Sequence, residues 1–383
     1  MTTPGPAPLR VLQVIDSIAP GGAEHALIDL VAGLRARGHA VDVAALGPPP
    51  TLASQFQATG ARTFQLGSGR RWDAGVARRL VRLSAGYDVV HAHLFMAEFY
   101  VAVTRLASPR VARVATLHNL GYDENVPTTL PQRARRQLHR RVLTRAFDAW
   151  TAVSAPVAQS YARHLGLGSI DVVPNAFSLP PDAPGPNFDA GAFRAGHGVD
   201  VGPLVVSVGR LTPQKGHAGL IDAVERLGRA DVTVAIVGDG PLRDALAARI
   251  AERGPATVRL LGAVPRAEVL RWIAAADAFV LPSIHEAFGV VLLEAMSLGR
   301  PIVATATGGV PSIVEDERSA LLVPPGAPAR LASALVRLLA DPALAARLAA
   351  AARADAAERF GQAAVATAFE AVYRRARDRR AGA

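Results

Sequence analysis

The chain has 383 residues, half of them hydrophobic and 19% charged, which is the composition of a folded protein and excludes a disordered one. Its length exceeds what one hydrophobic core usually organises, so two domains are expected. Cysteine is absent, which excludes disulfides, a thiolate nucleophile and cysteine-bound zinc, while the net charge of +10 favours anionic partners.

The beginning of the chain does not read as an export signal, because no basic stretch leads into a long apolar run with a cleavage site. No apolar stretch approaches the ~20 residues that a membrane-spanning helix needs. We therefore expect a cytoplasmic protein that is neither secreted nor membrane-spanning.

The first half of the chain alternates apolar strands with helical stretches. It begins with a strand at residues 9–18, a glycine-containing loop at 19–22 and an amphipathic helix to about residue 37. Further apolar runs lie at residues 39–46, 88–94, 111–117, 149–153 and 170–173. Such alternation predicts a parallel sheet covered by helices on both faces.

Two features of this half suggest a ligand site. Gly21 and Gly22 open the first helix, so their backbone can approach phosphate groups or another ligand closely, although a simple tight turn explains them as well. His118 follows a strand and lies at the same edge of the sheet, but a lone histidine is more often structural than catalytic.

An arginine-rich helical stretch follows. It contains Arg133, Arg135, Arg136, Arg140, Arg141 and Arg145. Such a helix can lie on the inner, anionic face of a membrane, or it can be a solvated helix in a chain that uses arginine almost everywhere. Nucleic acid is not expected as a partner, because these arginines lack interleaved aromatic residues for stacking on bases.

The second half repeats the architecture after a proline-rich linker at residues 178–187. Its strands are expected at residues 204–208, 232–237, 258–261, 278–281 and 301–304, and alanine-rich helices at 327–360. We predict an N-terminal domain at residues 1–182 and a C-terminal domain at 188–361. A last helix from residue 362 has an apolar face and is expected to rejoin the first domain, with residues 374–380 as a mobile tail.

Two cations follow the first strand of the second half. Arg210 and Lys215 lie in one loop and can converge on a diphosphate, where they would stabilise a departing phosphate. Solvated surface charges are the ordinary alternative. Lys215 is the only lysine among the 42 basic residues, which favours a position that needs a compact ammonium group.

The sharpest motif is HEAFG at residues 285–289, directly after an apolar strand. Gly289 allows close approach of the backbone, and the helix that starts at Val290 can direct free N–H groups at a diphosphate. Glu294 can bind two ribose hydroxyls and Glu286 the hydroxyls of a sugar. Two surface carboxylates near a helix start are the alternative.

Together these motifs resemble a family four retaining glycosyltransferase of the GT-B fold. The resemblance covers nearly the whole chain, at residues 21–24, 91–93, 117–119, 173–175, 208–216, 237–241 and 282–314. It implies two Rossmann-like α/β domains facing a cleft. It also implies that Arg210 and Lys215 bind the donor diphosphate and that Glu294 binds the ribose.

The resemblance assigns further contacts with the substrates. Glu286 and the backbone of Phe288 and Gly289 would hold the transferred sugar. Val264 would lie beside the base, and His118 near the reacting sugar.

We therefore expect transfer from a UDP-, GDP- or ADP-sugar to a hydroxyl of a glycan, lipid or small molecule. No Asp-x-Asp pair is present to hold a metal against the diphosphate, so neither a metal nor a cofactor is expected. A sugar epimerase or phosphorylase would share this architecture, and a non-catalytic nucleotide-sugar sensor would share even the donor residues.

Overall fold

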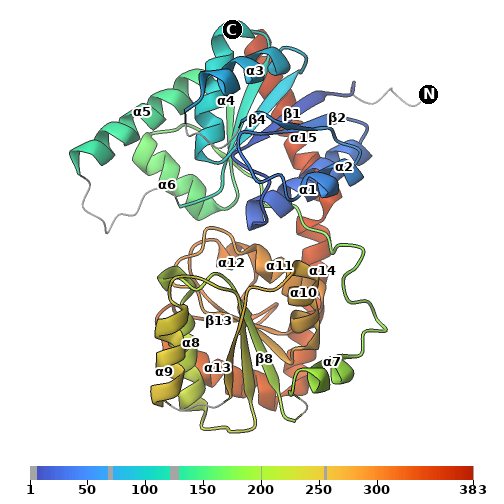
Figure 1. The fold of residues 1–383 in the computed structure, drawn as a ribbon, viewed down its shortest axis with the longest axis vertical. Helices are drawn as coiled ribbons and strands as arrows, with labels where there is room; N and C mark the ends of the chain where they lie inside the picture. The colour runs from blue at the N-terminus through green and yellow to red at the C-terminus, as the bar shows by residue number, and fades with distance from the viewer. Residues whose placement is uncertain (1–6, 68–71, 121–128, 200, 254–256, 383) are drawn as a thin grey trace. The chain divides into compact units, whose positions relative to one another are not determined.

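The computed structural model describes residues 7–67, 72–120, 129–199, 201–253 and 257–382. The chain forms two compact units, Met1–Phe177 with Phe360–Ala383, and Ser178–Arg359. Each unit contains one parallel sheet between helices (Figure 1). The prediction of an α/β protein with two Rossmann-like sheets is confirmed.

The first unit has a seven-stranded sheet in the order β3-β2-β1-β4-β5-β6-β7. Its strands are β1 (Arg10–Ile15), β2 (Ala40–Ala45), β3 (Thr63–Gln65), β4 (Val89–His93), β5 (Ala112–Leu117), β6 (Ala149–Ala152) and β7 (Asp171–Val172). Its helices are α1 (Gly22–Ala36), α2 (Ala53–Ala58), α3 (Ala74–Ser84), α4 (Phe95–Ala107), α5 (Leu130–Ala146), α6 (Ala155–Leu165) and α15 (Gln362–Ala381).

The second unit has a six-stranded sheet in the order β10-β9-β8-β11-β12-β13. Its strands are β8 (Leu204–Val208), β9 (Thr233–Val237), β10 (Val258–Gly262), β11 (Ala278–Leu281), β12 (Ile302–Thr305) and β13 (Leu321–Val323). Its helices are α7 (Ala190–Gly196), α8 (His217–Leu227), α9 (Arg243–Arg253), α10 (Arg266–Ala275), α11 (Val290–Ser297), α12 (Val310–Ile313), α13 (Pro328–Ala340) and α14 (Pro342–Phe360), with a 3-10 turn at Pro213–Lys215.

The strand order determines where ligands can bind. In each sheet the order reverses direction beside the first strand, between β1 and β4 in one unit and between β8 and β11 in the other. Loops that leave the carboxyl ends of such strands diverge and open a crevice. The candidate residues should therefore gather after Ile15 and His93 in the first unit, and after Val208 and Leu281 in the second.

The last helix, α15, packs into the first unit. Its buried residues Val365, Phe369, Val372 and Tyr373 share one apolar cluster with α1 and the first sheet. The expected mobile tail is wrong, because the helix continues to Ala381. Arg374 contacts Glu370 at 2.6 Å and Arg375 contacts Asp171 at 2.8 Å, while Arg379 donates to the Asp148 carbonyl at 3.2 Å.

Candidate active site

The loops that follow β8 and β11 in the second unit are in direct contact. Gly216, at φ 67°, lies against the loop after β11, where a Cβ would come within 2.0 Å of the Pro282 carbonyl oxygen. Two residues after Pro282, the amide of Ile284 donates to the Gln214 carbonyl at 2.7 Å. Only glycine fits at position 216, and this contact fixes the two loops relative to each other.

Lys215 and Glu286 meet across these loops. Nζ of Lys215 donates to Oε2 of Glu286 at 2.6 Å, and the Ser283 hydroxyl donates to the same oxygen at 3.1 Å. The Lys215 side chain is 25% exposed and that of Glu286 is 11% exposed, so the pair is shielded from bulk water but still reachable. Sequence reasoning missed Ser283, although it lies on the same turn as Glu286.

Arg210 lies in the same loop as Lys215 but is exposed. Within the part of the chain that the structure describes, its guanidinium has no carboxylate partner. The loop is tightly built, since a Cβ on Gly238 would lie 2.1 Å from the Gly209 carbonyl oxygen. The structure thus brings Lys215 to Glu286 and leaves Arg210 open to an anion.

The backbone of the Glu286 loop is hydrogen-bonded to the loop that follows β12. The amide of Gly309 donates to the Glu286 carbonyl at 2.9 Å, and the Thr307 hydroxyl donates to the Ile284 carbonyl at 2.8 Å. A Cβ on Gly308 would lie 1.8 Å from the Glu286 carbonyl oxygen, so the two backbones touch. The loop is therefore preorganised by main-chain contacts.

This loop leads into α11. Phe288 is buried, Gly289 caps the helix with φ 102°, and Val290 is its first residue. The first turn of α11 therefore presents backbone N–H groups at the carboxyl edge of the sheet, as an anion site requires.

Glu294 lies on α11 with an 11% exposed side chain and has an arginine partner that sequence reasoning missed. Nε of Arg266 donates to Oε1 of Glu294 at 3.2 Å. Nη2 of Arg266 is buried and has no hydrogen-bond partner among the described residues. Val264 lies two residues before Arg266, in the turn between β10 and α10. Arg266 therefore links the turn between β10 and α10, which contains Val264, to Glu294 on α11.

A buried histidine adjoins the Lys215 loop. His217 is 3% exposed, and burial followed by the charge of Lys215 lowers its pKa to about 4. The ring is neutral at neutral pH and adds no charge beside the lysine. It was missed because a single histidine at a helix start has no sequence signature.

In the first unit, Gly21 caps α1 and Gly22 is its first residue. A Cβ on Gly21 would lie 2.3 Å from a Glu24 carboxylate oxygen, so the turn and this carboxylate are in contact. Asp16 follows β1 and accepts a 2.7 Å hydrogen bond from the Ala97 amide at the start of α4. Burial raises the pKa of Asp16 and of Glu24. Sequence reasoning missed Asp16, and it gave Glu24 no role although this residue lies in one of the motifs that carry the resemblance.

His118 lies at the same edge of the first sheet and is linked to buried polar groups. Its Nε2 is 3.0 Å from Nδ1 of His93, whose Nε2 is 2.8 Å from Oε1 of Gln13. Burial lowers the pKa of His118 to about 4, so its ring is neutral at neutral pH. Both His93 and His118 border a cavity of about 10 Å³, room for a single water molecule.

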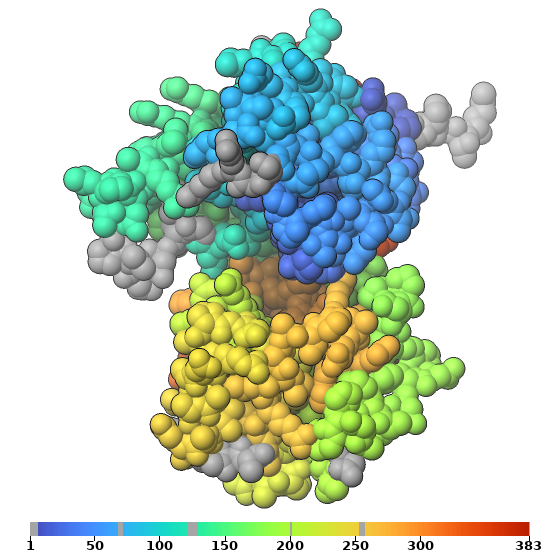
Figure 2. Space-filling model, viewed as in Figure 1, coloured from blue at the N-terminus to red at the C-terminus, as the bar shows by residue number. Residues whose placement is uncertain are grey.

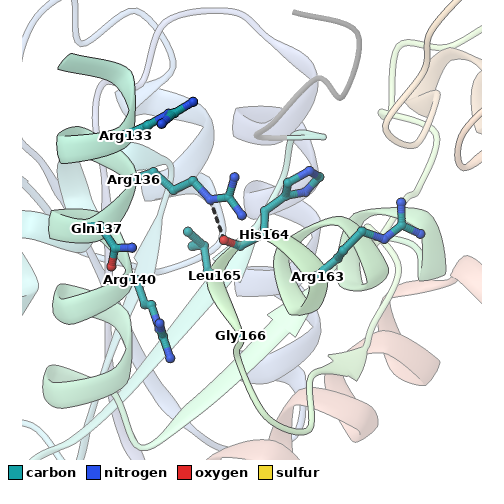
Figure 3. Close-up of a pocket in the computed structure, with 8 residues that line it drawn as sticks. All are labelled: Arg133, Arg136, Gln137, Arg140, Arg163, His164, Leu165 and Gly166. Atoms are coloured by element: carbon teal, nitrogen blue, oxygen red, sulfur yellow. Dashed lines mark hydrogen bonds between the residues drawn. The ribbon is translucent and has the colours of Figure 1, made fainter. Parts of the chain in front are cut away.

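The arginines of α5 do not share one face. Arg133, Arg136 and Arg140 border an open pocket of about 540 Å³ together with Arg163 of α6 (Figure 3). Nε of Arg136 donates to the His164 carbonyl at 2.5 Å. Arg135 instead lies over the ring of Phe95. Figure 2 shows the teal side chains of α5 projecting from the edge of the first unit. Every helix in the described ranges is too short or too polar to cross a bilayer.

Comparison with known proteins establishes the class. Residues 20–179 match the family described as Glycosyltransferase Family 4, and residues 192–355 match Glycosyl transferases group 1. A D-inositol 3-phosphate glycosyltransferase of Xylanimonas cellulosilytica is 34% identical over 324 residues, covering 80% of this chain and 76% of that protein. The chain belongs to glycosyltransferase family 4, and its activity is sugar transfer.

The names of two further relatives refer to different substrates. A 2-deoxystreptamine glucosyltransferase of Streptomyces kanamyceticus is 31% identical, covering 77% of this chain and 78% of that protein. An alpha-D-kanosaminyltransferase of the same organism is 29% identical, covering 89% of this chain and 92% of that protein. The family is therefore established, while its members differ in acceptor and donor.

Solved structures confirm the GT-B fold. Anabaena Alr3699/HepE in complex with UDP has a TM-score of 0.82 at 24% identity, covering 95% of this chain and 99% of that one. Sucrose-phosphate synthase from Thermosynechococcus elongatus has a TM-score of 0.76 at 24% identity, covering 95% and 98%. The Anabaena protein has also been solved with UDP-glucose.

Proposed function

We propose that the protein transfers a sugar, with retention of configuration and without a metal, from a nucleotide diphosphate-sugar to an acceptor hydroxyl. The second unit binds the donor and the first unit binds the acceptor. The observation that carries the proposal is the group of Lys215, Glu286 and the α11 N-terminus at one sheet edge, with Arg210 in the same loop. Cations, a carboxylate and backbone N–H groups are the partners that a sugar diphosphate needs.

Each donor residue has a separate task in this proposal. Arg210 and Lys215 stabilise the diphosphate as negative charge develops on it, and they replace the metal that other transferases use. Glu286 accepts hydrogen bonds from sugar hydroxyls, while the amides around Phe288 and Gly289 orient the sugar. Glu294, held by Arg266, accepts hydrogen bonds from the ribose hydroxyls beside Val264.

The reaction needs no enzyme nucleophile. The acceptor oxygen forms its bond to the anomeric carbon on the face from which the phosphate oxygen leaves, and the acceptor proton passes to the departing phosphate. His118 of the first unit accepts a hydrogen bond from a substrate hydroxyl, while Gly21 and Gly22 allow close approach of the backbone to the substrates.

UDP-sugars are the first donors to test, with GDP- and ADP-sugars as the alternatives. Support comes from the Anabaena protein, whose structures contain UDP and UDP-glucose. For the acceptor, two relatives are named for inositol 3-phosphate and 2-deoxystreptamine, which are both hydroxylated six-membered carbon rings. We propose a small cyclic polyol of this kind as acceptor.

The test combines donor binding with product analysis. A panel of UDP-, GDP- and ADP-sugars is screened by thermal shift, because a ligand that binds the native state raises the melting temperature. The best donor is then incubated with inositol 3-phosphate, myo-inositol and 2-deoxystreptamine in EDTA. A new α-configured glycoside and free nucleotide are expected. Epimerised donor, phosphorolysis or binding without turnover would replace this proposal.

A further inference from the structure

A continuous chain of buried hydrogen bonds connects the C-terminal helix to His118. The Tyr373 hydroxyl is 3.0 Å from Nε2 of Gln13, and Oε1 of Gln13 is 2.8 Å from Nε2 of His93. His93 then reaches His118 at 3.0 Å. Tyr373 and Gln13 are fully buried and His93 is 2% exposed, so water does not compete for these bonds.

The donors and acceptors in this chain run in one direction. Burial lowers the pKa of His93 and His118, so each ring carries one proton at neutral pH. The Gln13 carbonyl can only accept, so His93 carries its proton on Nε2 and accepts through Nδ1. His118 must then donate from Nε2. Its Nδ1 is left with a lone pair, which is an acceptor.

Tyr373 holds this direction because its hydroxyl serves two neighbours. It accepts from the Gln13 amide and donates to Nδ1 of His91 at 2.8 Å. His91 in turn donates from Nε2 to the Thr116 hydroxyl at 2.6 Å. The Gln13 amide can therefore turn over only if the protons of the Tyr373 hydroxyl, His91 and Thr116 reverse with it, so Tyr373 couples the orientation of Gln13 to the tautomer of His91.

We infer that Tyr373 is a positioning residue that fixes the tautomer of His118, keeping Nδ1 as the acceptor for a substrate hydroxyl. The inference rests on the proposed function, in which His118 contacts the substrates. Without the Tyr373 hydroxyl, the Gln13 amide can present its N–H groups to His93. His93 would then carry its proton on Nδ1, and His118 would carry its own on Nδ1, where it repels a hydroxyl donor.

The variant Tyr373→Phe tests this inference. It removes one oxygen and keeps the ring, which packs 5.9 Å from Phe369 and 5.6 Å from His91 between ring centroids. The matched control is Tyr87→Phe, which removes another buried hydroxyl of the same unit, bonded to Asp42 at 2.6 Å. The control should lose stability without altering the histidines.

Nitrogen-15 NMR of the imidazole rings in the full-length protein is the decisive measurement. In the wild type and in Tyr87→Phe, the shifts of His118 should show a protonated Nε2. In Tyr373→Phe they should move towards a protonated Nδ1. A wild-type His118 protonated on Nδ1, or an unchanged His118 in Tyr373→Phe, would overturn the inference. If Tyr373→Phe does not fold, the wild-type spectrum still tests the inference, because a His118 protonated on Nδ1 would contradict it.

Kinetics provide the second readout. Tyr373→Phe should lower kcat by about 10- to 100-fold, the range found for partners of metal-bound histidines, with a smaller change in donor KM. A shifted tautomer with an unchanged kcat would also overturn the inference. A wild-type protein without transferase activity would instead refute the proposed function, because the NMR result does not depend on turnover.

Discussion

Nζ of Lys215 lies 2.6 Å from Oε2 of Glu286 and joins the two loops that leave β8 and β11. The charge of Lys215 is therefore neutralised in part before any donor binds, and the contact fixes the position of the Glu286 carboxylate. Sequence reasoning gave these residues separate partners on the donor. The direct contact makes them one unit, so that a change in one alters the charge that the other presents.

Lys215→Ala and Arg210→Ala should each lower kcat by about 10²-fold or more, because each removes a preorganised cation from the departing diphosphate. The measurement is kcat at saturating donor. Arg330→Ala, at an exposed position on α13, is the control and should be unchanged. Near-normal rates in both site variants would remove the diphosphate clamp from the mechanism.

Acid should destabilise the first unit through His118 and the second unit through His217. Burial lowers the folded pKa of both to about 4, below the 6.5 of the unfolded chain. The unfolded state therefore binds protons first, and stability present above pH 6.5 is lost as the pH falls towards 4. Urea unfolding should show this decline, and His217→Asn should make it shallower. An unchanged slope in that variant would contradict a buried neutral His217.

Helix α5 should bind anionic vesicles if its arginines form a membrane contact. Leu130 and Leu138 are 79% and 53% exposed beside them, which favours an interfacial helix. Binding to vesicles with anionic lipid should weaken with salt and on neutralising Arg136, Arg140 and Arg141.

Two controls make the vesicle experiment specific. Neutral vesicles should not bind, and neutralising Arg330, Arg347 and Arg353, which are exposed in the second unit, should leave binding unchanged. Absent or salt-insensitive binding would identify α5 as an ordinary solvated helix.

The sequence predicted the sheets well where a strand is a full apolar run between helices. It missed β3 and β13, which have only three residues each: β3 (Thr63–Gln65) is not an apolar run, and β13 (Leu321–Val323) is apolar but very short. Side-chain partners were harder, because they depend on which loops the topology brings together. Arg266 and Glu294 are 28 positions apart, and Tyr373 and His91 are 282 positions apart. Neither spacing has a local pattern, so only the fold reveals these contacts.

Substitutions of Glu294 and Glu286 should impair the enzyme in different ways. In the proposed function, Glu294→Ala removes hydrogen bonds to the ribose that form before and during the reaction, so it should mainly raise donor KM, by about 1.5–3 kcal/mol in binding free energy. Arg266→Ala should have a similar but smaller effect, because Arg266 holds Glu294 through a 3.2 Å contact. Turnover at saturating donor should change little in either variant.

Glu286→Ala should mainly lower kcat and blur discrimination among sugars that share one nucleotide, because it orients the sugar as charge develops at the anomeric carbon. Its loss also frees Lys215 from a carboxylate, so a nucleotide diphosphate without sugar should bind at least as tightly as to the wild type. Calorimetry with UDP, GDP and ADP measures this directly. If Glu286→Ala weakened nucleotide binding and Glu294→Ala left it intact, the two roles would have to be exchanged.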